Sequence, residues 1–515
     1  MIAYPILWES GVYLPEQRLW LDPRQPRPRA VISHAHSDHV ADHPLAYATP
    51  ATRRLVTHRR RRPLLGTVEA VPYGQPIALD RCDVTFFPAG HVLGSAQTLV
   101  ETDFGRILYT GDRSDVDRLA MLEARNAGKP IRDARDEVLG AAQCFEYYAG
   151  AATRIFGETI PVTAPGLDFT LREPIGVCAL IVPWNGPLAI AAKKAAPALA
   201  AGNSIVLKPA PATPLTALEL ERIAREAGVP RGVFNVVTGA GPDTGRALVA
   251  HPRVDKISFT GSTRSGRDIL KNAADGIKRV SLELGGKSPQ IVFADSDFDT
   301  VVESAAWAVF WNCGQDCCAR SRVIVERPIY ERFVEALASR GSRMVVGDPL
   351  KPEVEIGSLI SSDQRDRVLG FIERAQGIGG ELHGGGKVVN APGLEAGNSI
   401  SPAVVSGVDP DAEIAREEVF GPIATALPFD TEEEAITLAN GTQYGLSGSL
   451  WTRDIGRAIR VAREVRSGLL SINSDNSSYL EAPFGGRKQS GIGREQGLEG
   501  LLDYTELKNV YVSDV

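Results

Sequence analysis

Two groups of side chains in this 515-residue sequence could carry catalysis, and they call for different chemistries. Near the N-terminus, His34, His36, Asp38 and His39 place three imidazoles and one carboxylate within six residues. These ligand types suit zinc, and the spacing of two puts His34 and His36 on one side of an extended loop. Far downstream, Cys317 lies among small and polar residues, where a thiol is either a nucleophile or a packing residue. Because no Cys-x-x-Cys pair or histidine is nearby, zinc is disfavoured there.

A covalent thiol mechanism also needs a base and an oxyanion donor, and the sequence offers a candidate for each. Glu283 lies in an apolar, strand-like run that ends in two glycines, so burial would raise its pKa and suit a general base. A capping or salt-bridged glutamate is the alternative. Asn185 lies in a proline-rich turn after the apolar strand 176–182, where it could present its amide. Asparagine at such a turn is usually structural.

The elements that would hold a dinucleotide are two strands, 203–209 and 256–262. The second strand turns through glycine and serine into a helix. Gly261 and Gly266 would let the backbone approach a pyrophosphate at the N-terminus of that helix. The glycine spacing departs from Gly-x-Gly-x-x-Gly, so the generic Rossmann fingerprint is absent.

The composition is that of an ordinary globular protein of two to four domains, with 43% hydrophobic and 23% charged residues. The net charge of −7 argues against nucleic-acid binding. Six cysteines without a disulfide pattern, no signal peptide and no membrane span together predict a cytoplasmic protein. Residue usage changes near position 113, because the first 113 residues contain no lysine and six of the eight histidines. The chain therefore reads as two segments of different origin.

The first segment resembles the metallo-β-lactamase superfamily, in particular its nuclease branch related to RNA 3′-end processing factors. The resemblance rests on the histidine cluster and on the runs FPAGHVLGSAQ (87–97) and YTGD (109–112). It implies a two-metal site whose ligands are His34, His36, Asp38, His39, His91 and Asp112. The family's second sandwich half and further histidine ligand are missing, since the only later histidines are His251 and His383. We therefore expect half of an αββα sandwich without phosphodiesterase activity, and the sequence leaves open whether it retains zinc.

From about residue 119 to the C-terminus, the chain resembles the NAD(P)-dependent aldehyde dehydrogenase superfamily. Seven motifs stand in the family's order: PWNGPL (183–188), KPAPATP (208–214), FTGSTRSG (259–266), LELGGKSP (282–289), GQDCCA (314–319), EEVFGP (417–422) and PFGGRKQSGIGRE (483–495). The resemblance implies an α/β fold with a Rossmann-type coenzyme domain, an α/β catalytic domain and a β-hairpin oligomerisation arm. It implies that Cys317 attacks the aldehyde, that Asn185 holds the oxyanion and that Glu283 activates the hydrolytic water. Lys194 and Glu495 match the family's proton-relay network.

The same resemblance implies which residues bind the coenzyme: Trp184, Lys208, Pro211, Gly241, Phe259, Gly261, Ser262, Gly266, Leu284, Glu418 and Phe420. At the position of Pro211, members that prefer NAD usually carry a glutamate that binds ribose hydroxyls and repels a 2′-phosphate. We therefore expect both NAD and NADP to serve. For the aldehyde, Trp311 matches relatives that act on cationic substrates, whereas Lys193 matches relatives that act on acidic ones. Gly186 widens the entrance, so the sequence predicts only a moderately broad tunnel.

We expect four parts in the chain: a partial metallo-β-lactamase-like segment (1–113), a coenzyme-binding domain (114–156 and 174–284), oligomerisation elements (157–173 and 489–515) and a catalytic domain (285–488). The coenzyme domain lacks the family's N-terminal layer, so residues 1–113 or a neighbouring subunit would cover its apolar surface. The strand 508–515 would complete a neighbour's sheet in a homodimer or homotetramer. The leading interpretation is an aldehyde dehydrogenase acting on a small-molecule aldehyde. The alternatives are a bifunctional protein with a live metal hydrolase, and a scaffold with neither site active.

Overall fold

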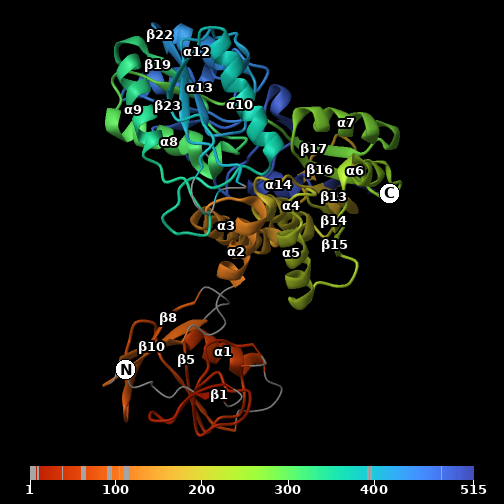
Figure 1. The fold of residues 1–515 in the computed structure, drawn as a ribbon. Coiled ribbons are helices and arrows are strands. Elements are labelled where there is room, and N and C mark those ends of the chain that lie inside the picture. Colours follow the sequence, from red (N-terminus) through yellow and green to blue (C-terminus); the bar gives the residue numbers. More distant parts are fainter. Residues whose placement is uncertain are drawn as a thin grey trace. The chain divides into compact units, whose positions relative to one another are not determined.

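The computed structural model describes residues 7–8, 11–36, 39–59, 65–89, 95–103, 105–109, 115–390, 394, 397–476 and 478–514. They form two compact units, and the chain passes from one to the other inside helix α2 (Asp115–Ala127), at Leu119 and Ala120 (Figure 1). Asp38, His91 and Asp112 of the predicted metal site lie outside the described residues. None of the described helices has both the length and the apolar character that crossing a membrane requires.

The described residues of the first unit contain two sheets, helix α1 and the start of α2. One sheet has the order β1-β2-β3-β4-β5-β6, with strands Leu7–Trp8, Val12–Leu14, Leu19–Leu21, Arg29–Val31, Leu45–Ala48 and Thr67–Ala70. The other has the order β10-β9-β8-β7, with strands β7 Ile77–Leu79, β8 Cys82–Pro88, β9 Ala96–Thr102 and β10 Gly105–Tyr109. The sheets share an apolar core to which Leu21 and Phe86 contribute. Helix α1 (Pro50–Arg59) packs Val56 against a separate cluster that includes Ala30 and Ala46 of the first sheet.

The second unit contains a six-stranded sheet of the order β15-β14-β13-β16-β17-β25. Its strands are β13 Val177–Ile181, β14 Ser204–Lys208, β15 Phe234–Val236, β16 Lys256–Thr260, β17 Arg279–Glu283 and β25 Gly491–Ile492. The first five strands in this order are parallel, and β25 runs antiparallel to β17. The inner strands are short and largely buried, as strands of a parallel sheet covered by helices are. The accompanying helices are α3 Ile131–Ala151, α4 Pro187–Ala200, α5 Leu215–Glu226, α6 Gly241–Ala250, α7 Thr263–Ala273 and α14 Gly497–Leu502.

A seven-stranded sheet of the order β20-β21-β22-β19-β18-β23-β24 forms the other half of this unit. Its strands are β18 Pro289–Val292, β19 Arg322–Glu326, β20 Glu381–Gly384, β21 Ala403–Ser406, β22 Ile423–Phe429, β23 Ser449–Trp451 and β24 Ser471–Ile472. Only β20 is antiparallel to its neighbour. The helices are α8 Phe298–Phe310, α9 Tyr330–Ser342, α10 Ser362–Gly377, α11 Glu413–Arg416, α12 Glu432–Asn440 and α13 Ile455–Glu464. The largest apolar core lies between this sheet and helices α8, α9 and α10.

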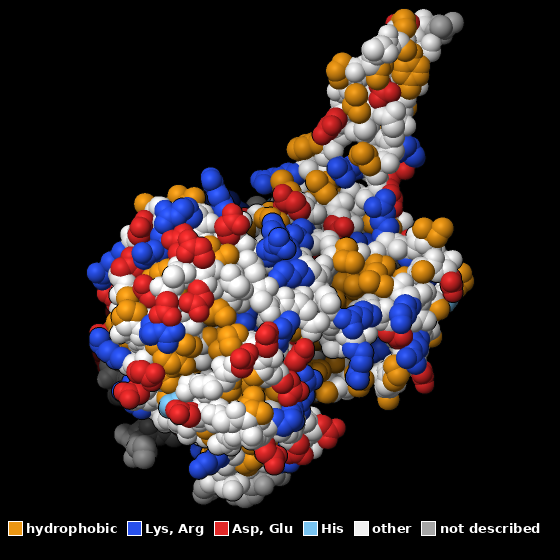
Figure 2. All heavy atoms as spheres, turned by 90° about the horizontal axis from the view of Figure 1, so that it is seen from above, with side chains coloured by type: hydrophobic (Ala, Val, Ile, Leu, Met, Phe, Trp, Pro, Cys, Tyr) orange, Lys and Arg blue, Asp and Glu red, His pale blue; other side chains and the backbone are white. Residues whose placement is uncertain are grey.

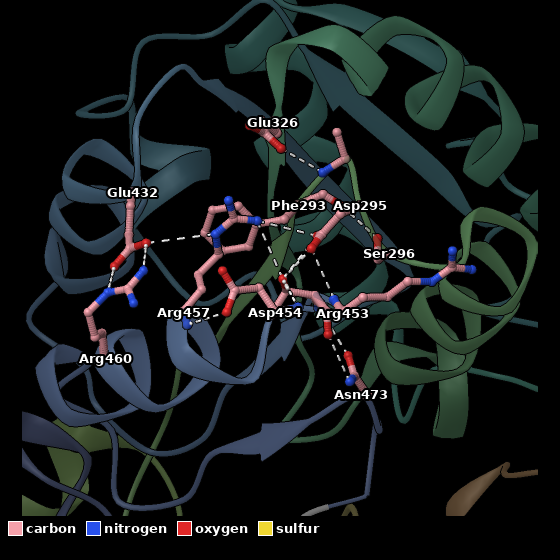
Figure 3. A network of polar contacts seen from close by, with 12 residues as sticks. Phe293, Asp295, Ser296, Glu326, Glu432, Arg453, Asp454, Arg457, Arg460 and Asn473 are labelled. Atoms are coloured by element: carbon pink, nitrogen blue, oxygen red, sulfur yellow. Dashed lines mark hydrogen bonds and ion pairs between the residues drawn. The ribbon is translucent and has the colours of Figure 1, made fainter.

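A polar network joins the loops that follow β18 and β23 (Figure 3). Asp295 accepts hydrogen bonds from the Thr452 hydroxyl at 2.8 and 2.9 Å and from the Arg453 backbone N–H at 3.1 Å. Arg457 lies 3.4 Å from the same carboxylate and stacks its guanidinium over the Phe293 ring. The network therefore joins two neighbouring strand ends of the larger sheet to helix α13.

An arm extends the second unit with three strands of the order β11-β12-β26: Thr159–Ile160, Gly166–Pro174 and Thr505–Ser513. The hairpin expected within 157–173 is present, and Gly166, the first residue of β12, has a φ of +142°. The predicted C-terminal strand is longer than 508–515 and pairs over nine residues with β12 of its own chain. Pairing with a neighbour's sheet stays a prediction. Figure 2 shows hydrophobic side chains along the arm.

Candidate active site

Cys317 lies in the loop between α8 and β19, at the wall of a cavity of about 670 Å³. The short helical turn Trp311–Gly314 precedes it, and Gly314 has a φ of +68°. A Cβ at Gly314 would lie 2.1 Å from the Gly421 carbonyl oxygen, so only glycine fits there. A hydrogen bond with the Cys318 thiol, together with burial, raises the pKa of the Cys317 thiol well above its ordinary value. A base or a nearby positive charge is therefore needed to form the thiolate.

Asn185 lines the same cavity, in the turn between β13 and α4. The residue is 9% exposed, and its side-chain Nδ2 donates a hydrogen bond to the Gln315 carbonyl oxygen at 3.0 Å. An amide nitrogen carries two hydrogens, so one remains to bind an oxyanion in the cavity. The turn after an apolar strand thus places an amide beside Cys317, as the sequence indicated.

Glu283 is the last residue of β17 and also lines this cavity. Glu283 is 3% exposed, and its carboxyl oxygen Oε2 has no hydrogen-bond partner among the described residues. Burial raises the pKa of Glu283 well above its ordinary value, and the neighbouring Glu495 carboxyl raises it further. The raised pKa makes the Glu283 carboxylate a stronger base than an exposed glutamate, which suits a general base for water.

Lys194 of α4 lies behind Glu283, fully buried, in an ion pair with Glu495. Its ammonium group also donates to the Ser258 hydroxyl at 2.9 Å. The positive charge of Lys194 lowers the pKa of Glu283, opposing burial and Glu495. The structure therefore brings together Cys317, Asn185, Glu283, Lys194 and Glu495, which are all five of the predicted catalytic residues.

The predicted pyrophosphate cradle lies at the start of α7. The Ser262 side chain caps this helix by accepting a hydrogen bond from the Ser265 backbone N–H at 3.2 Å. A Cβ at Gly261 would lie 2.5 Å from Cζ of Phe259, and one at Gly266 would lie 2.7 Å from Cδ2 of Leu284. Both glycines are thus required by close packing, and the helix N-terminus beside them suits a phosphate.

The remaining coenzyme candidates lie along the ends of β14, β13 and the loop before β22. Lys208 ends β14, is buried and donates to the Pro209 carbonyl oxygen at 3.2 Å, and burial lowers its pKa. Pro211 is exposed in the following turn, and Gly241 begins α6 with a φ of +69°.

Glu418 and Phe420 lie before β22 on the catalytic-domain side, whereas Trp184 lies in the turn after β13. Glu418 accepts a hydrogen bond from the Gly286 backbone N–H at 3.0 Å, and burial raises its pKa to about 7. The rings of Trp184 and Phe420 meet edge to face with centroids 5.2 Å apart. A Cβ at Gly285 would lie 2.4 Å from Glu418 Oε2, so this carboxylate requires a glycine opposite it. Together with the cradle at α7, these groups fit a dinucleotide.

Four residues around the cavity were missed by sequence analysis. Lys129, Glu137, Asn312 and Gln315 are all buried and connect to Asn185 or to each other. Lys129 and Glu137 flank the start of α3, and nothing in their residue types distinguishes them from surface charges. Their only sequence signal is the glycine–lysine–proline break between two helical patterns.

In the first unit, three side chains of types that bind metal ions lie close together. Asp22, His34 and His39 are buried, and one ligand atom of each lies within 4.8 Å of the others. His39 Nδ1 is 3.2 Å from Asp22 Oδ2, and His34 Nε2 is 3.1 Å from Nδ1 of His36. Asp22 also accepts hydrogen bonds from the Ser33 backbone N–H at 2.7 Å and from the Tyr109 hydroxyl at 3.0 Å. Sequence analysis missed Asp22, because one aspartate before a proline reads as a turn residue.

Comparison with known proteins shows which family the second unit resembles. The model of the family described as "Aldehyde dehydrogenase family" matches residues 112–510. The 4-trimethylaminobutyraldehyde dehydrogenase A of Danio rerio is 46% identical over 396 residues, which are 76% of this chain and 78% of the relative. The human retinal dehydrogenase 2 is 45% identical over 413 residues, which are 79% of each chain.

Solved structures agree with these relatives. The crystal structure of PnpE from Pseudomonas sp. WBC-3 has a TM-score of 0.76 and 45% identity, covering 77% of this chain and 82% of PnpE. A second PnpE structure contains nicotinamide adenine dinucleotide. These comparisons leave the metallo-β-lactamase resemblance of residues 1–113 untested. The chain belongs to the aldehyde dehydrogenase family and oxidises an aldehyde to a carboxylic acid with NAD(P)+.

Proposed function

We propose that the reaction is divided among the five predicted catalytic residues as follows. The Cys317 thiol releases its proton to solvent in the cavity, and its sulfur adds to the aldehyde carbon. The oxygen of the resulting thiohemiacetal is held by the Asn185 amide and the Cys317 backbone N–H. A nicotinamide coenzyme, when bound, would supply the acceptor for the hydride that leaves this carbon, so that a thioester would remain on Cys317. The observation that carries the proposal is that Cys317, Asn185 and Glu283 line one cavity.

Release of the acid then requires a base. Glu283 takes a proton from water as the water oxygen attacks the thioester carbon, and the Cys317 sulfur leaves as a thiolate. Burial keeps the Glu283 carboxyl basic enough for this step. The ion pair of Lys194 and Glu495 lies next to Glu283 and would receive the proton.

A pair of neighbouring thiols provides the test of this assignment. Replacing Cys317 by alanine should abolish NADH formation from a short aldehyde, because no other described thiol replaces its sulfur at the carbonyl. The Cys318→Ala variant is the matched control and should keep most of the activity. Activity that survives in C317A, or is lost equally in C318A, would refute the proposal.

We also propose that both NAD and NADP serve as coenzymes. Pro211 lies exposed after β14, three residues beyond the buried Lys208, and offers no carboxylate to repel a 2′-phosphate. The test compares KM for the two coenzymes in the wild type and in Pro211→Glu, where the new charge should weaken NADP alone. A wild-type KM ratio strongly in favour of NAD would contradict this.

We further propose that the preferred aldehyde carries a positive charge. The relatives do not decide this, since their names include both a trimethylammonium aldehyde and retinal. Of the six carboxyl side chains that line the cavity, Glu137 and Glu495 are paired with lysines and Glu283 has a raised pKa. The other three carboxyl groups face two cationic side chains: Asp136, Asp316 and Asp475 against Lys193 and Arg320. Trp311 lines it as well, and an aromatic face attracts a quaternary ammonium group. Lys193 lies over the Phe484 ring, with its Nζ 5.5 Å from the ring centroid.

Two aldehydes of equal shape separate charge from size. An aldehyde with a trimethylammonium group should have a higher kcat/KM than its uncharged tert-butyl isostere. The advantage should shrink in Asp475→Asn and at high salt, because both weaken the negative field of the cavity. Equal values for the two substrates would refute the proposal.

We also propose that the arm joins copies of the chain into a homodimer or homotetramer. Leu167, Leu507 and Val512 on β12 and β26 are each at least half exposed, which is unusual for a free surface. Light scattering of the purified protein gives the oligomer size. Charged substitutions at Leu167 and Leu507 should shift it toward the monomer, whereas a strictly monomeric wild type would exclude this role for the arm.

A second function is proposed for the first unit: it binds zinc. The observation in favour is that His34 Nε2 and His36 Nδ1 are 3.1 Å apart, close to the separation of two tetrahedral ligands bound to zinc at about 2.0–2.1 Å. Asp22 and His39 supply further ligand atoms beside them. Zinc content of the purified protein should fall in His34→Ala/His36→Ala and stay unchanged in the control His251→Ala. Equal zinc in all three proteins would exclude the site.

A further inference from the structure

The carbonyl oxygen of Asn185 is held from two sides. It accepts a hydrogen bond from Lys129 Nζ at 2.8 Å and another from Asn312 Nδ2 at 2.8 Å. A carbonyl oxygen has two lone pairs, so these donors saturate it. At the other end of the residue, the side-chain amide donates to the Gln315 carbonyl oxygen at 3.0 Å. The peptide plane and the side-chain amide of Asn185 are therefore both fixed, so the second hydrogen of the side-chain amide points in a single direction.

Lys129 reaches this carbonyl from the connection between α2 and α3, 56 residues earlier in the chain. It is 1% exposed, and its ammonium group lies 2.6 Å from Glu137 Oε1 on the first turns of α3. The second oxygen, Oε2, is buried without a hydrogen-bond partner among the described residues. Burial raises the pKa of Glu137 to about 7, even though the charge of Lys129 acts in the opposite direction.

Stability does not account for this buried pair. Desolvating two charges costs several kcal/mol per ion, and apolar residues of similar volume in place of such a pair are often neutral or stabilising. The pair does something that an apolar pair could not, because it directs a charged donor at the backbone of the oxyanion turn. Charge-assisted hydrogen bonds are stronger than neutral ones, so Lys129 restrains Asn185 more than Asn312 does.

We propose that Lys129, held in place by Glu137, is a positioning residue for the oxyanion site. It fixes the Asn185 peptide and thereby directs the second amide hydrogen toward the oxygen of the thiohemiacetal. The inference rests on the role proposed above for Asn185. Removing an oxyanion donor costs about 10²–10³ in rate, and a misplacement of about 1 Å can cost about 10². Loss of Lys129 should therefore cost about 10- to 100-fold in kcat/KM for the aldehyde, less than loss of Asn185 itself.

A double-mutant cycle tests whether Lys129 acts through Asn185. The variants are Lys129→Met, Asn185→Ala and the combination, measured by kcat/KM for the aldehyde and KM for the coenzyme. We expect K129M to lower kcat/KM in the wild-type background, to leave KM for the coenzyme unchanged, and to have no further effect when Asn185 is already alanine. A merely structural role would give the same loss in both backgrounds.

Lys256→Met is the matched control. Lys256 is as buried as Lys129, at 1% exposed. Its ammonium group forms an ion pair with Asp503 at 2.8 Å and donates a hydrogen bond to the Ser281 hydroxyl, instead of to the turn that holds Asn185. It should lower the melting temperature without the kinetic pattern of K129M. If K129M alone fails to fold, the cycle uses K129M/E137M, which leaves no unpaired charge.

Each outcome has one meaning. An effect of K129M that disappears in the N185A background supports the inference. No effect of K129M, or an equal effect in both backgrounds, overturns it and leaves the role of Asn185 standing. Full activity of N185A instead refutes the proposed role of Asn185, and the two failures are therefore distinguishable.

Discussion

Replacing Glu283 by glutamine should separate the two halves of the reaction. Glutamine keeps the shape of the buried side chain but cannot accept the proton of the hydrolytic water. Thiohemiacetal formation and hydride transfer depend on Cys317 and Asn185 and should continue. A general base contributes about 10²–10⁴ in rate, so kcat should fall by that factor.

Rapid mixing with an aldehyde and NAD+ resolves the two halves. Glu283→Gln should release NADH in a burst of one equivalent per active site, followed by a slow steady state set by thioester hydrolysis. Mass spectrometry should find the acyl group on Cys317. Absence of a burst would mean that Glu283 is also needed to deprotonate the Cys317 thiol, and an unchanged kcat would refute its role as base.

The same substitution has a predictable effect on pH dependence and stability. Burial and Glu495 raise the pKa of Glu283 in the folded protein, so its carboxyl is protonated at pH values where the unfolded chain would be ionised. The stability that this group contributes is present below its unfolded pKa and is lost as the pH rises through the folded pKa. Glu283→Gln should therefore melt at a higher temperature than the wild type at alkaline pH. The wild-type kcat should rise with pH through the folded pKa, and the variant should lack this rise.

Two further substitutions test the coenzyme cradle and the polar network of the larger sheet. Gly266→Ala places a Cβ 2.7 Å from Leu284 Cδ2, and such overpacking costs about 1–3 kcal/mol of stability. Because relief of this contact must displace Leu284 or the start of α7, coenzyme affinity in a fluorescence titration should also fall while folding persists. Unchanged affinity would place the coenzyme elsewhere. Asp295→Ala removes the carboxylate that accepts hydrogen bonds from Thr452 and Arg453. The free energy of unfolding in denaturant should fall by about 1–3 kcal/mol, with unchanged KM values for both substrates. A change in KM would mean that this network also shapes the active site.

The sequence predicted the reacting groups because each is marked by its immediate neighbours. Glu283 ends an apolar strand before two glycines, and Asn185 follows another apolar strand in a proline-rich turn. Both strands belong to one parallel sheet in which their carboxyl ends share an edge, so local patterns were enough to bring the two side chains together. Gly261 and Gly266 at the start of α7 were marked by the same kind of local pattern, and their approach to a pyrophosphate stays a prediction.

The supporting residues escaped prediction because their partners are distant in the chain. The bond from Lys129 to Asn185 spans 56 residues and that from Asn312 spans 127, and each ends on a backbone carbonyl, which carries no sequence signal. Asp22 was missed for a related reason, since its ligand geometry with His34 and His39 depends on how β3 and β4 pair. Sequence patterns identify groups that act at the site, whereas tertiary packing decides which groups hold them.

The position of Lys129 bears on the change of composition near residue 113. Two groups from the N-terminal side of the unit hold Asn185: Lys129, which precedes α3, and Glu137, which lies on α3 and pairs with Lys129. Helix α2 adds Glu123, which accepts a hydrogen bond from the Leu188 backbone N–H at 3.2 Å. All of them follow residue 113 and lie within the range that the family model matches. A change of sequence before α2 therefore leaves the oxyanion turn with its complete set of supports. Activity should consequently depend on α2 and α3, and substitutions in the first unit at His34 and His36 should leave kcat/KM for the aldehyde unchanged.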